Sequence, residues 1–244
     1  MKITFLVIFF FIFFISCEKE QFSDFNETRG ILSKDSVNIA EFDSLIIKNV
    51  FDVYLFQDTV NYIVIEGIKN LAKNVKIEII NNTLTLDTES KYIWTKPNNN
   101  KIKITIHFKN ISKIDIREAS RTESINEISG NELGIILNCK IAEVKLKLNH
   151  NIFYFWNNRG GVLELEGNVN ELKIWNFALS NIFAGKLISD KVIIENHSLG
   201  DCEIGLANHI SGGIFNKGNI YYKGNPIIEN FYTDSNSGKL IKEN

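Results

Sequence analysis

The chain of 244 residues contains only two prolines, Pro97 and Pro226, and no excess of basic residues. Because proline cannot donate a hydrogen bond to a sheet, its scarcity suits a chain made mainly of paired strands. Lysine and arginine number 27 against 29 aspartates and glutamates, and no basic patch is interleaved with aromatic residues. A role in binding nucleic acid is therefore not expected.

Several signatures of catalysis and metal binding are also missing. The sequence has no Gly-x-Ser-x-Gly elbow, phosphate-binding loop, dinucleotide fingerprint or calcium-binding loop. Its histidines show no zinc-type spacing, and His107 alternates outward in its segment as a surface residue would. The four are His107, His150, His197 and His209. We expect no metal site and no cofactor.

Long apolar runs are absent except at the N-terminus. After Lys2, residues 3–15 form an apolar segment rich in phenylalanine. This segment is shorter than the roughly 20 residues that span a bilayer, and it is typical of a secretory signal. It ends at Ser16-Cys17, which resembles a bacterial lipobox, in which the cysteine is acylated and becomes the first residue of the mature protein. Residues 1–16 are thus a predicted signal peptide, and Cys17 is the predicted lipidation site.

The stretch that follows Cys17 is polar and mixed in charge, with no clear period. We interpret residues 17–40 as a lipidated tether that attaches the protein to a membrane, which more than one acyl chain would make stable. Its start, Glu18-Lys19-Glu20, resembles an acidic export signal of outer-membrane lipoproteins. The expected location is the bacterial outer membrane, facing either the periplasm or the cell surface, and residues 41–244 suit a single all-β domain.

Five asparagines recur at a near-constant spacing in the second half of the chain. The steps between them are 19, 19, 20 and 20 residues, and each lies two residues after a large apolar residue. A fixed period of about 20 residues is typical of a solenoid in which each period forms one coil. The five are Asn138, Asn157, Asn176, Asn196 and Asn216.

Apolar and polar residues alternate on both sides of these asparagines. Such alternation predicts strands with one buried face, at least two per coil, stacked as parallel strands about 4.8 Å from the next coil. The asparagines then lie at corners between strands. There a short amide tolerates left-handed backbone and can hydrogen-bond the coils above and below. We expect a structural asparagine ladder.

The two remaining cysteines differ in position. Cys202 falls on an inward-facing position, where a free cysteine packs as a small hydrophobe. Cys139 follows the predicted corner at Asn138, three coils away, so a disulfide between the two is not expected.

The first half of the domain also consists of short alternating segments. Asn81-Asn82 is a predicted hairpin turn, and residues 68–74 contain one predicted helical turn. No long amphipathic helix is present, which indicates an all-β domain. The predicted strands cover residues 45–47, 53–56, 62–66, 75–80, 84–87 and 102–108.

Segments at both ends of the domain resemble a known family. They are Phe42-Asp43-Ser44-Leu45, Val50-Phe51-Asp52-Val53-Tyr54-Leu55 and Val64-x-Glu66-Gly67 near the start, and Gly218-Asn219-Ile220-Tyr221-Tyr222-Lys223-Gly224-Asn225-Pro226 near the end. These are similar to the head GIN domain of putative auto-transporter adhesins, over about residues 42–240. The resemblance implies a right-handed parallel β-helix-like fold in a secreted or lipid-anchored protein, and it offers no catalytic residues to transfer.

Glu164 and Glu166 are the best paired carboxylates in the chain, at a separation of about 7 Å that is near that of glycosidase pairs. One coil earlier, the same positions hold Lys145 and Lys147. We therefore expect Lys145 to face Glu164 and Lys147 to face Glu166, as a lateral ladder of ion pairs.

An aromatic surface is the feature that exceeds structural need. The residue just before each corner asparagine is expected to point outward, which stacks Trp156 on Trp175, flanked by Leu137 and by Tyr154. Exposed aromatic patches mark binding surfaces, and flat rings suit sugar faces or the side chains of a protein partner. The alternative is that another segment covers these rings.

The favoured function is a non-enzymatic, lipid-anchored envelope protein that presents a binding or adhesion surface to a glycan or to an envelope or surface protein. A polysaccharide-active β-helix enzyme and a purely structural envelope scaffold are the alternatives. The enzyme would need a cluster of acidic and basic groups in one groove, and the sequence shows only the expected ion-pair ladder.

Overall fold

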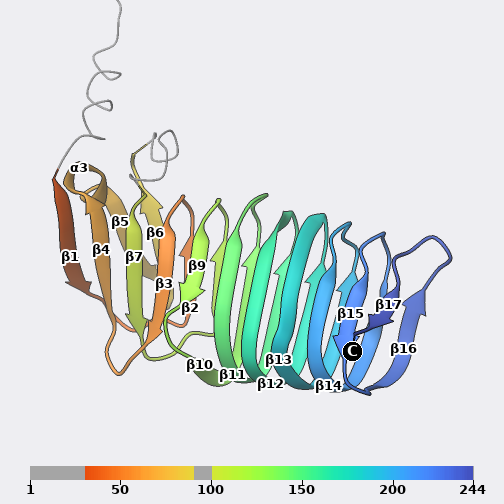
Figure 1. The fold of residues 1–244 in the computed structure, drawn as a ribbon. Coiled ribbons are helices and arrows are strands. Elements are labelled where there is room, and N and C mark those ends of the chain that lie inside the picture. The colour runs from red at the N-terminus through yellow and green to blue at the C-terminus, as the bar shows by residue number, and fades with distance from the viewer. Residues whose placement is uncertain (1–30, 91–100, 244) are drawn as a thin grey trace, which may run out of the picture.

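The computed structural model describes residues 31–90 and 101–243, which form an all-β solenoid of about six turns (Figure 1). The predicted signal peptide, Cys17 and residues 17–30 of the predicted tether lie outside the described residues. Residues 31–90 and 101–243 contain one helix, α3, which has four residues and is too short to cross a bilayer. The prediction of an all-β solenoid is confirmed.

The strands have the following bounds: β1 Leu32–Asn38, β2 Ser44–Ile47, β3 Asp52–Gln57, β4 Tyr62–Ile68, β5 Val75–Ile80, β6 Thr83–Thr88, β7 Lys103–Phe108, β8 Lys113–Ile116, β9 Arg121–Ser124, β10 Ile128–Leu137, β11 Glu143–Asn157, β12 Gly160–Asn176, β13 Leu179–Asn196, β14 Cys202–Ile214, β15 Ile220–Lys223, β16 Ile227–Thr233 and β17 Leu240–Lys242. Helix α3 spans Lys69–Ala72.

Two ladders of strands make the two broad sides of the solenoid. Ladder A has the order β1-β4-β7-β3-β9-β11-β12-β13-β14-β15-β17. Ladder B has the order β5-β6-β2-β8-β10-β11-β12-β13-β14-β16. Strands β11 to β14 each bend near the middle. The first half of each strand belongs to ladder A, and the second half belongs to ladder B. The inward residues of both ladders form one continuous apolar core.

The coils of the first half do not stack in sequence order. The coil of β2 and β3 lies between the coil of β6 and β7 on one side and the coil of β8 and β9 on the other. Strand β4 adds to the outside of β7 antiparallel, and β5 pairs antiparallel with β6. These antiparallel strands and α3 close the N-terminal end of the solenoid. The predicted hairpin is confirmed, since Asn81 and Asn82 adopt positive φ angles of 50° and 58° between β5 and β6.

The predicted tether, residues 17–40, is too long at its C-terminal end, because strand β1 belongs to the folded domain. Residues 32–38 pair along their whole length with β4, antiparallel. Their side chains are exposed or half-exposed on both faces, so no apolar period marks the strand in the sequence. Backbone pairing with β4, together with the ion pair between Lys34 and Glu66, places it.

A ladder of buried asparagines runs through the corner at the end of ladder B. Asn157 Nδ2 donates to Asn176 Oδ1 at 3.1 Å, and Asn176 Nδ2 donates to Asn196 Oδ1 at 3.0 Å. All three side chains are fully buried. Asn157 Oδ1 also accepts hydrogen bonds from the backbone N–H groups of Arg159 and Gly160, which hold the turn. The ladder thus satisfies the polar groups of the corner inside the core.

Two of the five predicted members stand outside this ladder. Leu137, not Asn138, is the register partner of Asn157. Asn196 has Ile214 as its partner, so Asn216 lies two residues further along. The coils differ in length by one or two residues at these places, which moves both asparagines out of the inward row. The predicted left-handed backbone is also wrong, since no corner asparagine has a positive φ.

The two cysteines lie buried and free, and burial raises the pKa of Cys202 to about 12. A less expected buried group is His150, in the bend of β11, with 5% of its surface exposed. Neither of its ring nitrogens has a hydrogen-bond partner among the described residues. Burial lowers the pKa of His150, and the nearby backbone of Ile128 offsets this only in part.

The asparagine ladder predicts the effect of Asn176→Leu. The change removes the acceptor of the Ser180 hydroxyl and one of the two partners of the Asn157 side-chain amide and of the Asn196 side-chain carbonyl. A buried group left unpaired costs about 1–3 kcal/mol, so a loss of at least this size in unfolding free energy is expected in urea titrations. The control Asn170→Leu removes an exposed amide, and surface changes stay within about 0.5 kcal/mol. Equal stability of the two variants would contradict the ladder's role.

His150 predicts a pH dependence of stability. Its pKa in the folded state is lowered, whereas the unfolded ring takes up a proton near its ordinary value of about 6.5. The unfolded state therefore binds more protons as the pH falls through about 6.5, and the free energy of unfolding decreases, by at most about 1.4 kcal/mol per pH unit. The free energy of unfolding, measured in urea at several pH values between 7.5 and 5, should fall less steeply with decreasing pH for His150→Leu than for the wild type. An equal pH dependence in both proteins would refute the role given to His150.

Candidate binding surface

The predicted tryptophan pair lies on the outer face of ladder B. Trp156 on β11 and Trp175 on β12 are register partners, with ring centroids 5.4 Å apart and planes tilted by 32°. Trp156 is 42% exposed and Trp175 is half-buried. The two rings therefore lie next to each other in adjacent coils, as the spacing predicted, but they are tilted and not stacked face to face, and solvent reaches them.

Leu137 does not belong to this surface. It was predicted to point outward beside Trp156, but it is fully buried in the core. The reason is the register between β10 and β11, in which Ile136 is the partner of Trp156 and Leu137 is the partner of the inward Asn157. Ile136 takes the outward place and is half-exposed.

Tyr154 lies two residues before Trp156 on the same face. Its ring covers Gly134 of the preceding coil so closely that a β-carbon at position 134 would collide with it. The ring thus lies directly over Gly134 of β10. Burial, together with the negative charge of Glu132, raises the pKa of Tyr154. One face of this ring is closed by the protein itself.

The tryptophans are the beginning of a longer feature, the aromatic column, which continues through every later coil. Centroid distances are 6.2 Å from Trp156 to Phe177, 4.6 Å from Phe177 to His197, 4.3 Å from His197 to Phe215 and 5.3 Å from Phe215 to Tyr232. Its members are Trp156, Trp175, Phe177, His197, Phe215 and Tyr232. Five coils at about 4.8 Å give it a length of about 19 Å along the solenoid axis.

From Phe177 onward the rings of the column are stacked on one another, whereas Trp156 is tilted against Trp175 and Phe177. The planes of Phe177, His197 and Phe215 are within 16° of parallel, and those of Phe215 and Tyr232 within 17°. Since the faces of the inner rings cover each other, the ring edges are what these residues present to solvent. Sugars stack on ring faces, so the inner rings do not offer the platform that flat exposed aromatics suggested.

Polar planar groups extend the column towards the N-terminal coils. The Trp156 indole N–H donates to Asn158 Oδ1 at 2.6 Å, Asn158 Nδ2 donates to Asn138 Oδ1 at 2.8 Å, and Asn138 Nδ2 donates to Asp115 Oδ1 at 2.8 Å. Asn138 thus takes part in this chain of hydrogen bonds and not in the buried asparagine ladder. The corner surface is thus amide-lined over its first coils and aromatic over its last.

Sequence reasoning found the tryptophans but missed Phe177 and His197. The prediction rests on the residue before each asparagine, whereas these two follow the inward residues Asn176 and Asn196. Tyr232 was missed because its coil has no asparagine at the corner position. Aromatic residues on both sides of each corner asparagine indicate every member of the column except Tyr232.

The predicted ion-pair ladder is confirmed on ladder A. Lys145 Nζ lies 3.1 Å from Glu164 Oε1, and Lys147 Nζ lies 3.1 Å from Glu166 Oε1. Both pairs bridge β11 and β12 as register partners. The best carboxylate pair of the chain is therefore neutralised by lysines at surface positions. Such exposed pairs contribute only fractions of a kcal/mol to about 1 kcal/mol.

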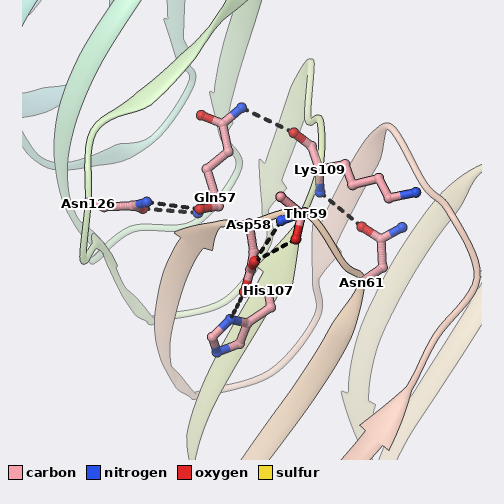
Figure 2. A network of polar contacts seen from close by, with 7 residues as sticks. All are labelled: Gln57, Asp58, Thr59, Asn61, His107, Lys109 and Asn126. Atoms are coloured by element: carbon pink, nitrogen blue, oxygen red, sulfur yellow. Dashed lines mark hydrogen bonds and ion pairs between the residues drawn. The ribbon is translucent and has the colours of Figure 1, made fainter.

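A polar network joins the N-terminal coils to the rest of the solenoid (Figure 2). Gln57 Nε2 donates to the carbonyl oxygens of Lys109 and Ser129, and Gln57 and Asn126 exchange two hydrogen bonds with each other at 2.9 Å. Asn61 Oδ1 accepts a hydrogen bond from the Lys109 backbone N–H at 2.9 Å. The network fastens the β3–β4 turn to two later connections of the chain.

His107 belongs to the same network. It was predicted to be a surface histidine, but its side chain is largely covered. Strand β4 pairs with β7 and brings Tyr62 over the ring, with centroids 3.9 Å apart and planes at 13°. His107 Nδ1 lies 3.0 Å from Asp58 Oδ2. Hydrogen bonds from the Thr59 backbone N–H and from His107 lower the pKa of Asp58. No cluster of three potential metal ligands occurs within residues 31–90 and 101–243.

Comparison with known proteins places this geometry in context. A family model described as "putative auto-transporter adhesin, head GIN domain" matches residues 41–226. A search of curated proteins finds no match.

Solved structures share the fold at low sequence identity. A putative adhesin from Bacteroides fragilis is 21% identical with a TM-score of 0.76, and the match covers 88% of this chain and 99% of that one. A putative adhesin from Parabacteroides distasonis is 16% identical with a TM-score of 0.65, covering 88% and 98%. A structure described as a putative lipid binding protein, from the same species, is 16% identical with a TM-score of 0.64, again covering 88% and 98%.

Proposed function

Because this chain belongs to the head GIN domain family of putative auto-transporter adhesins, we propose that it is a non-enzymatic, lipid-anchored protein of the bacterial cell envelope. Its solenoid presents a binding surface to a partner outside its own chain. The outer membrane is its location, with Cys17 as the acylated residue. The family membership supports the adhesin or binding role and an envelope location.

The observation that carries the binding role is the aromatic column. It runs along one corner for five coils, and Trp156, Phe215 and Tyr232 expose about half of their surfaces. Packing alone does not require large aromatic side chains at these outward positions, and exposed apolar patches of this kind mark interaction surfaces. Aromatic anchors also dominate binding energy once a partner desolvates them.

Ring orientation favours a protein partner over a glycan. The inner rings turn their edges outward because their faces are stacked. Aliphatic and aromatic side chains pack well against ring edges, which carry the positive part of the aromatic quadrupole. A sugar ring would need an open face, which the stacked rings do not provide.

The described charged groups support a non-enzymatic role. Glu164 and Glu166 are each paired with a lysine, and Asp58 is engaged by His107 and by the Thr59 backbone N–H. A glycosidase needs one carboxyl group with a raised pKa beside a second, ionised one. The carboxyl groups with a resolved shift, on Glu41, Asp58 and Glu171, all have lowered pKa values.

Anchoring is tested by Cys17→Ser. Loss of the acyl site should move the chain without residues 1–16 from the membrane fraction to the soluble fraction of cells, because the acyl group is its proposed anchor. The measurement is an immunoblot of fractionated cells, with Cys139→Ser as the matched control that keeps Cys17. Complete retention of Cys17→Ser in the membrane fraction would rule out the lipid anchor.

Binding is tested by the double change Trp156→Ser with Trp175→Ser. We expect it to reduce binding of the purified full chain to an envelope protein extract at least tenfold, with a loss of stability below about 3 kcal/mol because the pair is already half-exposed. Phe183→Ser is the matched control, since Phe183 is 41% exposed but lies on ladder A.

Two results would contradict this function. Unchanged binding of the double variant would move the binding surface away from the column. Strong binding of the wild type to an array of neutral and acidic glycans, lost in the double variant, would replace the protein partner with a glycan.

A further inference from the structure

The corner where the described chain begins is unusually apolar for a surface. Ile31 and Leu32 are 83% and 74% exposed, the highest values for large hydrophobic side chains among the described residues. Strand β1, which starts here, contributes no buried side chain to the core and pairs only with β4 within the described part of the chain. Packing inside the domain therefore gives no reason for two large aliphatic side chains at this position.

Lys69 lies next to this pair, and Lys73 follows one helical turn later, with its backbone N–H donating to the Lys69 carbonyl oxygen at 3.1 Å. The Lys69 backbone N–H donates to the Ile31 carbonyl oxygen at 3.0 Å, which joins the start of α3 to the start of β1 at one end of the solenoid (Figure 1). Lys69 and Lys73 are exposed and form no ion pair with any residue in the described ranges. Lys34 of β1, by contrast, is held by Glu66 at 3.0 Å. The corner thus combines two aliphatic side chains with two unpaired ammonium groups.

This combination matches the surface of a phospholipid bilayer. Aliphatic side chains enter the boundary between headgroups and acyl chains, while lysines reach the phosphates of the headgroups. Each basic residue adds attraction to an anionic leaflet, and the contact is weak unless something else holds the protein nearby.

The sequence places such a tether beside this corner. Ile31 is the fourteenth residue after Cys17. At no more than about 3.6 Å per residue, the chain between them reaches at most about 50 Å. An acyl group on Cys17 would therefore keep this corner close to the bilayer and raise its effective concentration there.

We propose that Ile31, Leu32, Lys69 and Lys73 form a membrane-contact site that docks the N-terminal end of the solenoid on the phospholipid surface holding the anchor. The proposal rests on the lipid anchor proposed at Cys17. Ladder A has eleven strands, so its far end at β17 then stands about 48 Å from the docked end. The aromatic column, which occupies the last five coils, then lies in the half of the solenoid far from the bilayer that carries the protein.

The experiment uses the full acylated chain in vesicles of phosphatidylcholine and phosphatidylglycerol that carry a quencher on the headgroups. One fluorophore is attached at Ser36→Cys in β1 and, in a separate sample, at Asn236→Cys near the C-terminal end. Cys139 and Cys202 are buried and stay unlabelled. We expect quenching at position 36 to exceed quenching at position 236 at least threefold.

The test variant carries Ile31→Ser, Leu32→Ser, Lys69→Ser and Lys73→Ser together. It should stay in the vesicle fraction through its acyl group, keep its melting temperature within a few degrees, and lose most of the quenching at position 36. The matched control is Ile141→Ser with Leu179→Ser and Lys140→Ser, which removes similarly exposed side chains elsewhere on the surface. This control should quench like the wild type.

Three outcomes would overturn the proposal: equal quenching at the two labels, unchanged quenching in the fourfold variant, or quenching that requires a high density of protein on the vesicle. The last would assign the corner to contact with a second copy of the chain. Each can occur while the chain remains anchored, so each removes the docking site alone. Membrane retention of Cys17→Ser would instead remove the anchor and the function built on it.

Discussion

Backbone hydrogen bonds between successive coils are the constraint on which the rest of this structure depends. They fix the spacing of like positions at the distance between paired strands and leave each side chain with one neighbour above and one below. Any residue type that repeats at a position must therefore form a row. The buried amides of Asn157, Asn176 and Asn196, the lysine–glutamate pairs of ladder A and the aromatic column are three solutions to this one geometric condition.

The rows also explain what could be predicted from the sequence. Coils of nearly equal length made the period of about 20 residues visible, and this period placed Trp156 beside Trp175 and Lys145 beside Glu164. It failed where a coil is longer or shorter than its neighbour. A shift of one residue between β10 and β11 was enough to bury Leu137 and to exclude Asn138 from the buried ladder, because inward and outward positions alternate along a strand.

Other features left no signal in the sequence. Strand β1 is placed by backbone pairing and needs no apolar pattern. The cover over His107 comes from an antiparallel neighbour, Tyr62, that lies 45 residues away in sequence, and alternation within β7 contains no information about it. The stacking of Phe177 on His197 depends on the ring orientations, which decide whether a face or an edge meets the solvent. Positions can be read from periodicity, whereas cover and orientation come from tertiary contacts.

The order of the first coils has a consequence for how the chain reaches its folded state. Ser44 of β2 pairs with Thr83 and with Lys113, residues 39 and 69 positions later, so the first coil remains incomplete until most of the N-terminal half has been assembled. Closing such long loops lowers the entropy of the chain before the stabilising contacts have formed. From β10 onward each coil pairs with the one immediately before it in sequence, so growth can proceed by short local steps on a finished template. We therefore expect polarised folding, in which the N-terminal coils form the slow nucleus and the C-terminal coils add to it one repeat at a time.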